Sequence, residues 1–555
     1  MFKPELFNSL KNYSLKQFGS DVSAGLIVGI VALPLAIAFA IASGVAPEQG
    51  LYTAIIAGFI ISFLGGSKVQ IGGPTGAFVV IVFTVIQDYG LSGLYVATIM
   101  AGIMLVFMGV FKLGILVKYI PYTIITGFTA GIAVTILTTQ IGDFFGLVTG
   151  PMPGDFVGKI TTYIKSFDTI NFYAMGVALV SFALILIWPK ISRKIPGSLV
   201  VIVVVTVLVK LLNLPVDTIG SRYGAIPTSL PMPKFPEISF EMIQSLISPA
   251  LSIAILAAIE SLLSAVVADG MIGAKHDSNM ELVGLGIANM VVPLFGGIPS
   301  TGAIARTATN VKNGGRTPVA GIVHAITLLL VMLIFGRFAV YIPLATLAAI
   351  LVSVAINMAG IPAIKLLCKG QKSDITVLTV TFLLTIFVDL TMAIEVGLVC
   401  AAFFFIKKMI DLSVIREFHS SVNNGDSLTK EKNELIHNIP EGIFVFEIDG
   451  PLFFGTAQKF EVATSRLGID YKVLVLRLQN MSYLDAGGLH VLEQLYDTCK
   501  SRNITLLISE IRIQPYILLL KSKLLDKIGK DNLPGSMQET LERGKEIIAQ
   551  GKKEE

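Results

Sequence analysis

Two glycine- and proline-containing motifs carry the clearest sign of chemistry in this sequence. GGPTGAF at 72–78 and GGIPSTGA at 296–303 each interrupt an apolar segment of the chain. Glycine permits non-helical backbone and proline fits the first turn of a helix, so each motif predicts an unwound strand leading into a half-helix. Such backbone is tolerated at membrane depth only where protein buries it or where it lines a polar cavity. One motif alone would equally fit a packing kink, but the pair predicts a cavity.

Two ionisable residues add chemistry to this cavity. Glu260 lies in the apolar segment AILAAIESLLSAVVADG. A carboxylate inside a membrane span is costly and is functional by default, so Glu260 is a candidate proton carrier, with a structural hydrogen bond as the alternative. Arg306, one turn into the second half-helix, would supply a fixed positive charge. Because Lys312 and Arg316 follow it, Arg306 also fits a snorkelling or cytoplasmic basic residue.

The composition shows in which solvent the elements that position these residues must fold. The chain has 555 residues, of which 54% are hydrophobic and 14% charged, with a mean hydropathy of +0.77. These values exclude a soluble globular enzyme and make the lipid bilayer the main solvent. The cysteines Cys368, Cys400 and Cys499 lack the spacing of a disulfide framework or a metal site, so no cofactor or metal is expected. The net charge of +4 is modest, and nucleic acid is not an expected partner.

Hydropathy predicts an all-α polytopic membrane domain at 21–410, after a cytoplasmic N-terminal segment at 1–20. Lys and Arg cluster in every second loop, so the positive-inside rule places both termini in the cytoplasm. The long segments 139–170 and 213–246 are then extracytoplasmic loops with short interfacial helices. Fourteen spans are expected, at 22–43, 51–65, 75–88, 91–111, 116–138, 171–189, 198–212, 247–268, 281–296, 303–311, 317–336, 342–360, 374–388 and 391–410.

The interrupted spans are the third and the tenth, so they are seven spans apart. Seven is an odd number, and the second set of seven must therefore insert in the opposite sense, which predicts 7+7 inverted repeats. The two half-helix N-termini would then face each other near the midplane. Each presents unpaired N–H groups and a partial positive charge, which favours an anion between them.

These motifs resemble those of the SulP family of anion transporters. The resemblance rests on LPLAIAFAIASGVAPEQGLYTAI at 33–55, GGPTGAF at 72–78, AAIESLLSAVVAD at 257–269 and GGIPSTGAIARTATNVKNGGRTP at 296–318. It implies core and gate domains, an elevator-like displacement and a homodimer. It also implies an anion held between the third and tenth helices, beside the first. The implied substrate-binding residues are Phe39, Thr75, Gly76, Ala77, Phe78, Gly302, Ala303 and Arg306.

The coupling ion is inferred from the same resemblance. Similar sodium-coupled bicarbonate members carry Asp where this chain has Glu260, and a hydroxyl residue near the position of Ile304, which has no side-chain oxygen. Ser264, one turn after Glu260, remains as a candidate cation ligand. Proton-coupled symport through Glu260 is therefore favoured. A sodium-coupled symporter, an anion exchanger, a channel and a membrane sensor remain as alternatives.

A small α/β domain is expected at 441–555, after a linker at 411–440. It resembles the STAS domain shared by sulfate transporters and anti-sigma-factor antagonists. In MSYLDAGGL, Asp485 and the following Ala486 and glycines occupy the loop where antagonists carry a phosphorylatable Ser or Thr, so regulation or binding is expected in place of a phosphate switch. A regulatory protein or a nucleotide is a candidate partner by analogy alone.

The anion itself is left open between sulfate, bicarbonate and a dicarboxylate. The apolar side chains Phe39, Phe78 and Ile304 favour a small or partly apolar carboxylate over strongly hydrated sulfate. A transporter of uncharged nucleobases shares the inverted-repeat plan, but Arg306 and the C-terminal domain disfavour it. The short chain and the absence of a transit peptide favour a bacterial cytoplasmic membrane.

Overall fold

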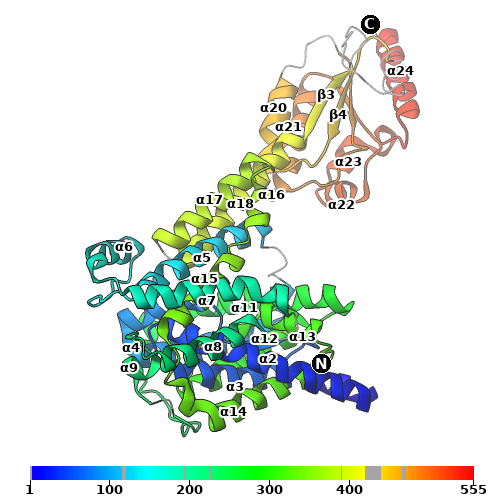
Figure 1. Ribbon diagram of the computed structural model, residues 1–555. Coiled ribbons are helices and arrows are strands. Elements are labelled where there is room, and N and C mark those ends of the chain that lie inside the picture. The colour runs from blue at the N-terminus through cyan, green and yellow to red at the C-terminus, as the bar shows by residue number, and fades with distance from the viewer. Residues whose placement is uncertain are drawn as a thin grey trace. The chain divides into compact units, whose positions relative to one another are not determined.

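The computed structural model describes residues 3–115, 120–192, 196–225, 227–388, 390–418, 439–465 and 471–554. The chain forms two compact units, Met1–Cys400 and Ala401–Glu555. The first unit is built almost entirely of helices, and the second combines a sheet with helices (Figure 1). This is the expected combination of an all-α membrane domain with a small α/β domain.

Every predicted span coincides with a described helix or with one half of a broken helix. Among the described residues, nine helical segments are long and apolar enough to cross a membrane. The span helices are α2 (Leu15–Ala42), α3 (Pro47–Leu64), α4 (Phe78–Val110), α5 (Tyr122–Phe145), α7 (Phe172–Ile191), α8 (Gly197–Leu211), α11 (Ile247–Ile272), α12 (Ser278–Val291), α13 (Ile304–Lys312), α14 (Val319–Ala339), α15 (Leu344–Met358), α17 (Lys372–Phe387) and α18 (Leu390–Leu412).

Helix α4 joins the third and fourth predicted spans across a break at Gly90. This residue has φ 71° and ψ −178°, a backbone conformation that is accessible to glycine and strained for other residues. A β-carbon at Gly90 would meet no atom within 4 Å, so backbone conformation and not crowding requires the glycine. The break separates a first segment that starts at the GGPTGAF motif from a second full-length segment.

Short helices occupy the connections of the membrane unit. In the two segments predicted to hold interfacial helices lie α6 (Phe156–Lys165), α9 (Ile219–Tyr223) and α10 (Phe240–Ser245). Asp155 caps α6 by accepting a 2.8 Å hydrogen bond from the Gly158 N–H. The other short elements are α1 (Glu5–Ser9), η1 (Leu10–Asn12), η3 (Phe167–Thr169), η4 (Val292–Phe295) and α16 (Ile361–Leu367).

Small residues let the membrane helices pack closely. Gly102 of α4 and Gly286 of α12 face each other, and a β-carbon at either would lie within 2.7 Å of the other's carbonyl oxygen. Burial of apolar surface gives little drive to association between helices in lipid, so van der Waals contact at such sites supplies much of the attraction. The close pairs α4–α12, α2–α14 and α5–α17 follow this rule.

The second unit contains a four-stranded sheet in the order β3-β4-β5-β6. Strand β3 (Val414–Phe418) pairs antiparallel with β4 (Ile443–Asp449), whereas β5 (Val473–Arg477) and β6 (Thr505–Ser509) continue in parallel. The apolar runs of β4 and β5 are buried on both faces, as a covered parallel sheet requires. The helices are α20 (Phe454–Ser465), α21 (Ala486–Ser501), α22 (Ile513–Lys521), α23 (Leu524–Ile528), η5 (Lys530–Asn532) and α24 (Met537–Glu554).

The segment 411–440, expected as a linker, contains part of this sheet. Strand β3 lies within it and pairs with β4 from Val414↔Asp449 to Phe418↔Val445. The pattern Val-Ile-Arg-Glu-Phe was too short and too mixed in polarity to stand out as a strand. Residues 419–438 of the expected linker lie outside the described residues.

Candidate functional site

The two glycine- and proline-containing motifs meet as a two-stranded antiparallel sheet. In β1 (Gly72–Gly73) and β2 (Thr301–Gly302), Gly72 pairs with Gly302 and Gly73 with Thr301. The Ala303 N–H extends the contact by donating to the Ile71 carbonyl at 2.9 Å. Segments far apart in the sequence thereby satisfy each other's backbone groups, as non-helical backbone inside a membrane requires.

Each strand leads into a helix, as the motifs predict. Helix α4 begins at Phe78 and α13 at Ile304. With nine residues, α13 spans only about 14 Å, roughly half of a bilayer core. The first N–H groups of a helix lack intrahelical acceptors, so the start of α13 offers hydrogen-bond donors beside the paired strands. At the start of α4, by contrast, the Phe78 and Val79 N–H groups donate to the Thr75 and Gly76 carbonyls at 3.2 and 3.1 Å.

Glu260 of α11 reaches the first of these helix starts. Its Oε2 accepts a 2.9 Å hydrogen bond from the Thr75 hydroxyl. Both side chains are half-buried, while Gly76, Ala77 and Phe78 beside them are buried. The carboxylate of α11 therefore lies directly at the residues that connect β1 to α4.

Arg306 binds the first motif from the second one. Its side chain is 2% exposed, and Nη2 donates a 2.7 Å hydrogen bond to the Pro74 carbonyl. Among the described residues, Nη1 has no hydrogen-bond partner and the guanidinium has no ion pair. The guanidinium packs against Gly73, where a β-carbon would overlap Nη1. Arg306 therefore brings a buried, uncompensated positive charge to the start of α4.

The apolar wall of the site comes from α2. A β-carbon at Gly76 would lie 3.2 Å from Cε1 of Phe39, which places the Phe39 ring against this glycine. Phe39 and Phe78 are both buried, whereas Ile304 is 43% exposed. Gly302 lies so close to the Gln70 amide that a β-carbon would overlap it.

Ser264, the candidate cation ligand, joins α11 to α13. Its hydroxyl donates to Thr307 Oγ1 at 3.3 Å, and the same oxygen accepts a 3.0 Å bond from the Ile71 N–H. Ser264 and Thr307 are both buried. The hydroxyl of Ser264 therefore already has a protein partner, Thr307, on the helix that also carries Arg306.

A second buried carboxylate, Glu281 of α12, was not predicted as part of the site. It is fully buried and accepts hydrogen bonds from the N–H groups of Gly66 at 2.8 Å and Ser67 at 3.0 Å. Its other oxygen accepts from Gln70 Nε2 at 2.7 Å. These contacts fix the chain just before β1. The one sequence feature that could have identified Glu281 is its position in a predicted apolar span.

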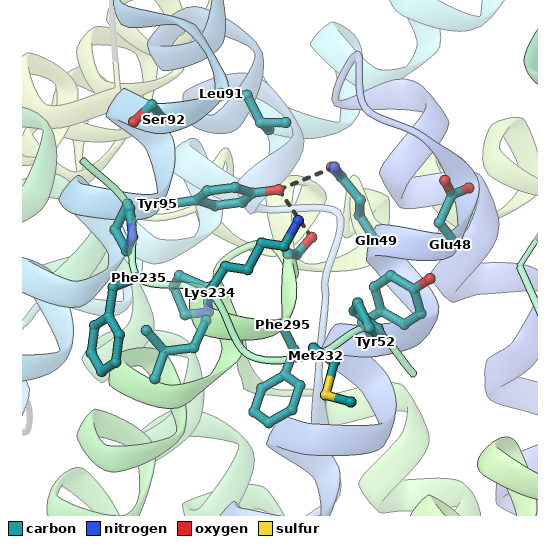
Figure 2. A pocket seen from close by; sticks show the side chains of 15 residues that line it. Glu48, Gln49, Tyr52, Leu91, Ser92, Tyr95, Met232, Lys234, Phe235 and Phe295 are labelled. Carbon is teal, nitrogen blue, oxygen red and sulfur yellow. Dashed lines mark hydrogen bonds between the residues drawn. The ribbon is translucent and has the colours of Figure 1, made fainter. Parts of the chain in front are cut away.

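Two cavities lie elsewhere in the membrane unit, and none of the predicted site residues lines either. One, of about 410 Å³, is bounded by the start of α3, the second half of α4 and the segment around Lys234. Figure 2 shows Tyr95, Gln49 and Lys234 around it; Tyr95 Oη accepts from Gln49 and donates to the Gly296 carbonyl. The other, of about 450 Å³, lies along the first half of α4.

In the second unit, Asp485 acts as a helix cap. Its carboxylate accepts hydrogen bonds from the N–H groups of Gly488 at 2.8 Å and Phe454 at 3.1 Å. The cap starts α21 and ties it to the start of α20. Gly487 and Gly488 are required here because the start of α21 packs closely against Leu452 and Phe454.

The fold and the site define a multi-pass membrane transporter with inverted repeats and a C-terminal α/β domain. The model of the sulfate permease family matches residues 18–381, and that of the STAS domain matches residues 435–543. The chain belongs to the sulfate permease family, and it is an anion transporter of that family.

Relatives of known name match over most of the chain. The putative sulfate transporter YvdB of Bacillus subtilis is 44% identical over 94% of this chain and 97% of its own. The bicarbonate transporter BicA of Picosynechococcus sp. is 30% identical over 94% of both chains. Among solved structures, SLC26A9 has a TM-score of 0.86 at 19% identity, covering 99% of this chain and 93% of its own. The transmembrane domain of a cyanobacterial BicA has a TM-score of 0.62 at 30% identity, covering 70% and 98%.

Proposed function

We propose that this protein is a secondary active transporter that takes up a small anion together with protons. The observation that carries the proposal is the buried guanidinium of Arg306, whose Nη1 has no partner among the described residues. A buried cation without a counter-charge is costly, and a bound anion would supply that charge. The helix start at Ile304 would add N–H donors, and Phe39 an apolar wall.

Proton coupling is assigned to Glu260. Its carboxylate is hydrogen-bonded to Thr75, at the residues proposed to hold the anion. Protonation would remove a negative charge beside the anion and so favour its binding. Ile304 offers no side-chain oxygen, and the Ser264 hydroxyl is directed to Thr307, which favours protons over sodium as the coupling ion.

An elevator-like movement is proposed because the site elements are bonded into one block. The Thr75–Glu260 bond joins the connection between β1 and α4 to α11, and the Arg306–Pro74 bond joins the same connection to α13. The Ser264–Thr307 bond joins α11 to α13. A block connected in this way moves more readily as a rigid body than by rearranging internally. The remaining helices would form the gate against which the block moves.

The anion is proposed to be sulfate, bicarbonate or a dicarboxylate. YvdB bears the name of a sulfate transporter and BicA that of a bicarbonate transporter. The apolar ring of Phe39 and the exposed Ile304 favour a small or partly apolar carboxylate. We place the protein as a homodimer in a bacterial cytoplasmic membrane, with both termini in the cytoplasm and the STAS domain as a regulatory or binding domain.

The test is uptake of labelled sulfate, bicarbonate and fumarate by proteoliposomes under an inward proton gradient, an inward sodium gradient, or neither. Proton-driven accumulation would support the proposal and identify the anion. Accumulation only with sodium would overturn the coupling assignment. Equilibration without accumulation would indicate a channel, and stimulation by internal anion an exchanger. No uptake would favour a sensor.

The Glu260→Gln variant tests the proton-carrying role. We expect it to lose acceleration by the proton gradient while keeping anion binding. Glu241→Gln is the matched control, since Glu241 is an exposed carboxylate on α10. If Glu260→Gln retained full proton-driven uptake, Glu260 would not be the coupling residue.

A further inference from the structure

The 450 Å³ cavity along the first half of α4 contains a buried cation that the site described above does not use. The cavity begins at Val80 and Ile81, one turn beyond the start of α4, and continues to Asp88. Helices α5, α6, α10, α11, α17 and α18 and the residues just before α6 and just after α17 contribute the rest of its lining. It therefore lies along α4 between the proposed anion-binding residues and the side of the unit predicted to be extracytoplasmic.

The cation is Lys159 of α6. Its side chain is 4% exposed, and its Nζ lies 4.3 Å from the centroid of the Phe83 ring of α4. Among the described residues the Lys159 ammonium has no hydrogen-bond acceptor and no ion pair. Its one electrostatic contact there is the cation–π contact with the Phe83 ring. A cation–π contact compensates only part of the hydration that a buried ammonium loses.

Helix α6 holds Lys159 rigidly in this place. The Phe156 ring packs edge-on against Phe387 of α17 at 5.4 Å, and the Tyr163 hydroxyl donates to the Thr139 carbonyl of α5 at 3.4 Å. These contacts lie on either side of Lys159 and fix α6 to the helices proposed as the gate. Lys159 then reaches from the gate side to the moving helix α4.

The cavity also contains carboxylates, which differ from Lys159 in exposure. Asp88, Asp155 and Glu395 are all exposed. Asp155 is in addition engaged in capping α6. Water and salt screen exposed charges strongly, whereas a buried charge is screened much less. The most weakly screened of these charges is therefore the ammonium of Lys159, whose pKa burial lowers and Asp155 partly restores.

We propose that Lys159 forms an outer anion-binding subsite, at which a small inorganic or carboxylate anion rests on its way to the site at the start of α4. The anion would replace the missing counter-charge of the ammonium and would lie over the face of the cavity formed by α4. This proposal rests on the proposed transport function and deepens it by naming a second binding position and its residue.

The kinetic test compares three variants in proteoliposomes. Lys159→Met keeps an unbranched side chain of similar size and removes its charge, Lys159→Arg keeps the charge, and Lys165→Met alters an exposed lysine of the same helix. We expect Lys159→Met to raise KM for uptake of sulfate or fumarate about tenfold or more, with kcat for uptake little changed. Lys159→Arg and Lys165→Met should remain near wild type. Equal KM values for uptake in all variants would overturn the proposal.

A second measurement does not depend on transport. Wild-type protein is treated with a membrane-impermeant amine reagent, with and without sulfate or fumarate, and modification is read at each lysine by mass spectrometry. Anion binding should slow modification of Lys159 at least severalfold and leave Lys165 unchanged. Equal modification with and without both anions would overturn the subsite. If wild-type protein transports none of sulfate, bicarbonate and fumarate but Lys159 is protected, the transport function fails and the subsite stands.

Discussion

The Thr75 hydroxyl lies 2.9 Å from Oε2 of Glu260 and is its hydrogen-bond donor, so the residue that leads into α4 also orients the carboxylate of α11. The bond connects the proposed anion position with the proposed proton position. Anion binding at the start of α4 and protonation of α11 can therefore influence each other over one contact.

Replacing Thr75 tests this coupling. Thr75→Val keeps the shape of the side chain and removes the donor, which leaves the carboxylate unpaired at a cost of about 1–3 kcal/mol. We expect proton-driven uptake to fall about tenfold or more. Thr75→Ser restores the hydroxyl and should keep most of the activity. Equal loss in both variants would show that packing, and not the hydrogen bond, is the role of Thr75.

Gly73 is predicted to tolerate no side chain. Its φ of 151° disfavours other residues, and a β-carbon would overlap Nη1 of Arg306. Gly73→Ala should displace the guanidinium and cost roughly 1–3 kcal/mol for the backbone conformation alone. We expect lower thermal stability in detergent and loss of uptake. Gly176→Ala in α7 is the control, since a β-carbon there meets no atom within 4 Å.

Glu281 is predicted to support the site without touching the anion. Glu281→Gln would replace the carboxylate, to which the N–H groups of Gly66 and Ser67 now donate, by a neutral amide. The lost charge-assisted bonds amount to about 2–3 kcal/mol of stability. Thermal unfolding in detergent measures this loss. Unchanged stability would mean that the carboxylate does not hold the segment before β1.

Cys499 in the STAS domain is predicted to be unreactive in the folded protein. It is buried in α21, and burial raises its pKa to about 12, which Arg502 opposes only in part. A maleimide at pH 8 should label the exposed Cys368 and spare Cys499, whereas denatured protein labels both. Peptide mass spectrometry distinguishes the two sites.

The raised pKa of Cys499 also predicts how the stability of the STAS domain changes with pH. The thiol is favoured in the folded state, so its contribution is fully present below pH about 9, the ordinary pKa of the group. It is lost as pH rises from about 9 toward 12. Cys499→Ala should remove this alkaline dependence. An identical pH profile of unfolding in the variant would contradict the assignment.

The sequence was sufficient for the features that depend on local composition. Apolar runs predicted the membrane helices, and the glycines and prolines near 72 and 296 predicted the strands β1 and β2 and the helices after them. The alternation after residue 441 predicted the α/β domain. Each of these patterns is encoded within about 20 neighbouring residues.

Features that depend on long-range contacts could not be predicted. The hydrogen bond from Arg306 to the Pro74 carbonyl and those from Gly66 and Ser67 to Glu281 join parts of the chain more than 200 residues apart. Their acceptors and donors include backbone groups, which carry no sequence signal. Strand β3 was missed because a short edge strand needs β4 beside it to be stabilised.

The pairing of Gly72 with Gly302 also sets a condition on biosynthesis. The partner strand is made about 230 residues after β1, a delay of roughly 10 to 50 s at ordinary rates of translation. Throughout that time the polar backbone around Gly72 and Gly73 has no partner and is poorly soluble in lipid. The first half of the chain must therefore stay sheltered at the insertion machinery, or by water, until the second half emerges.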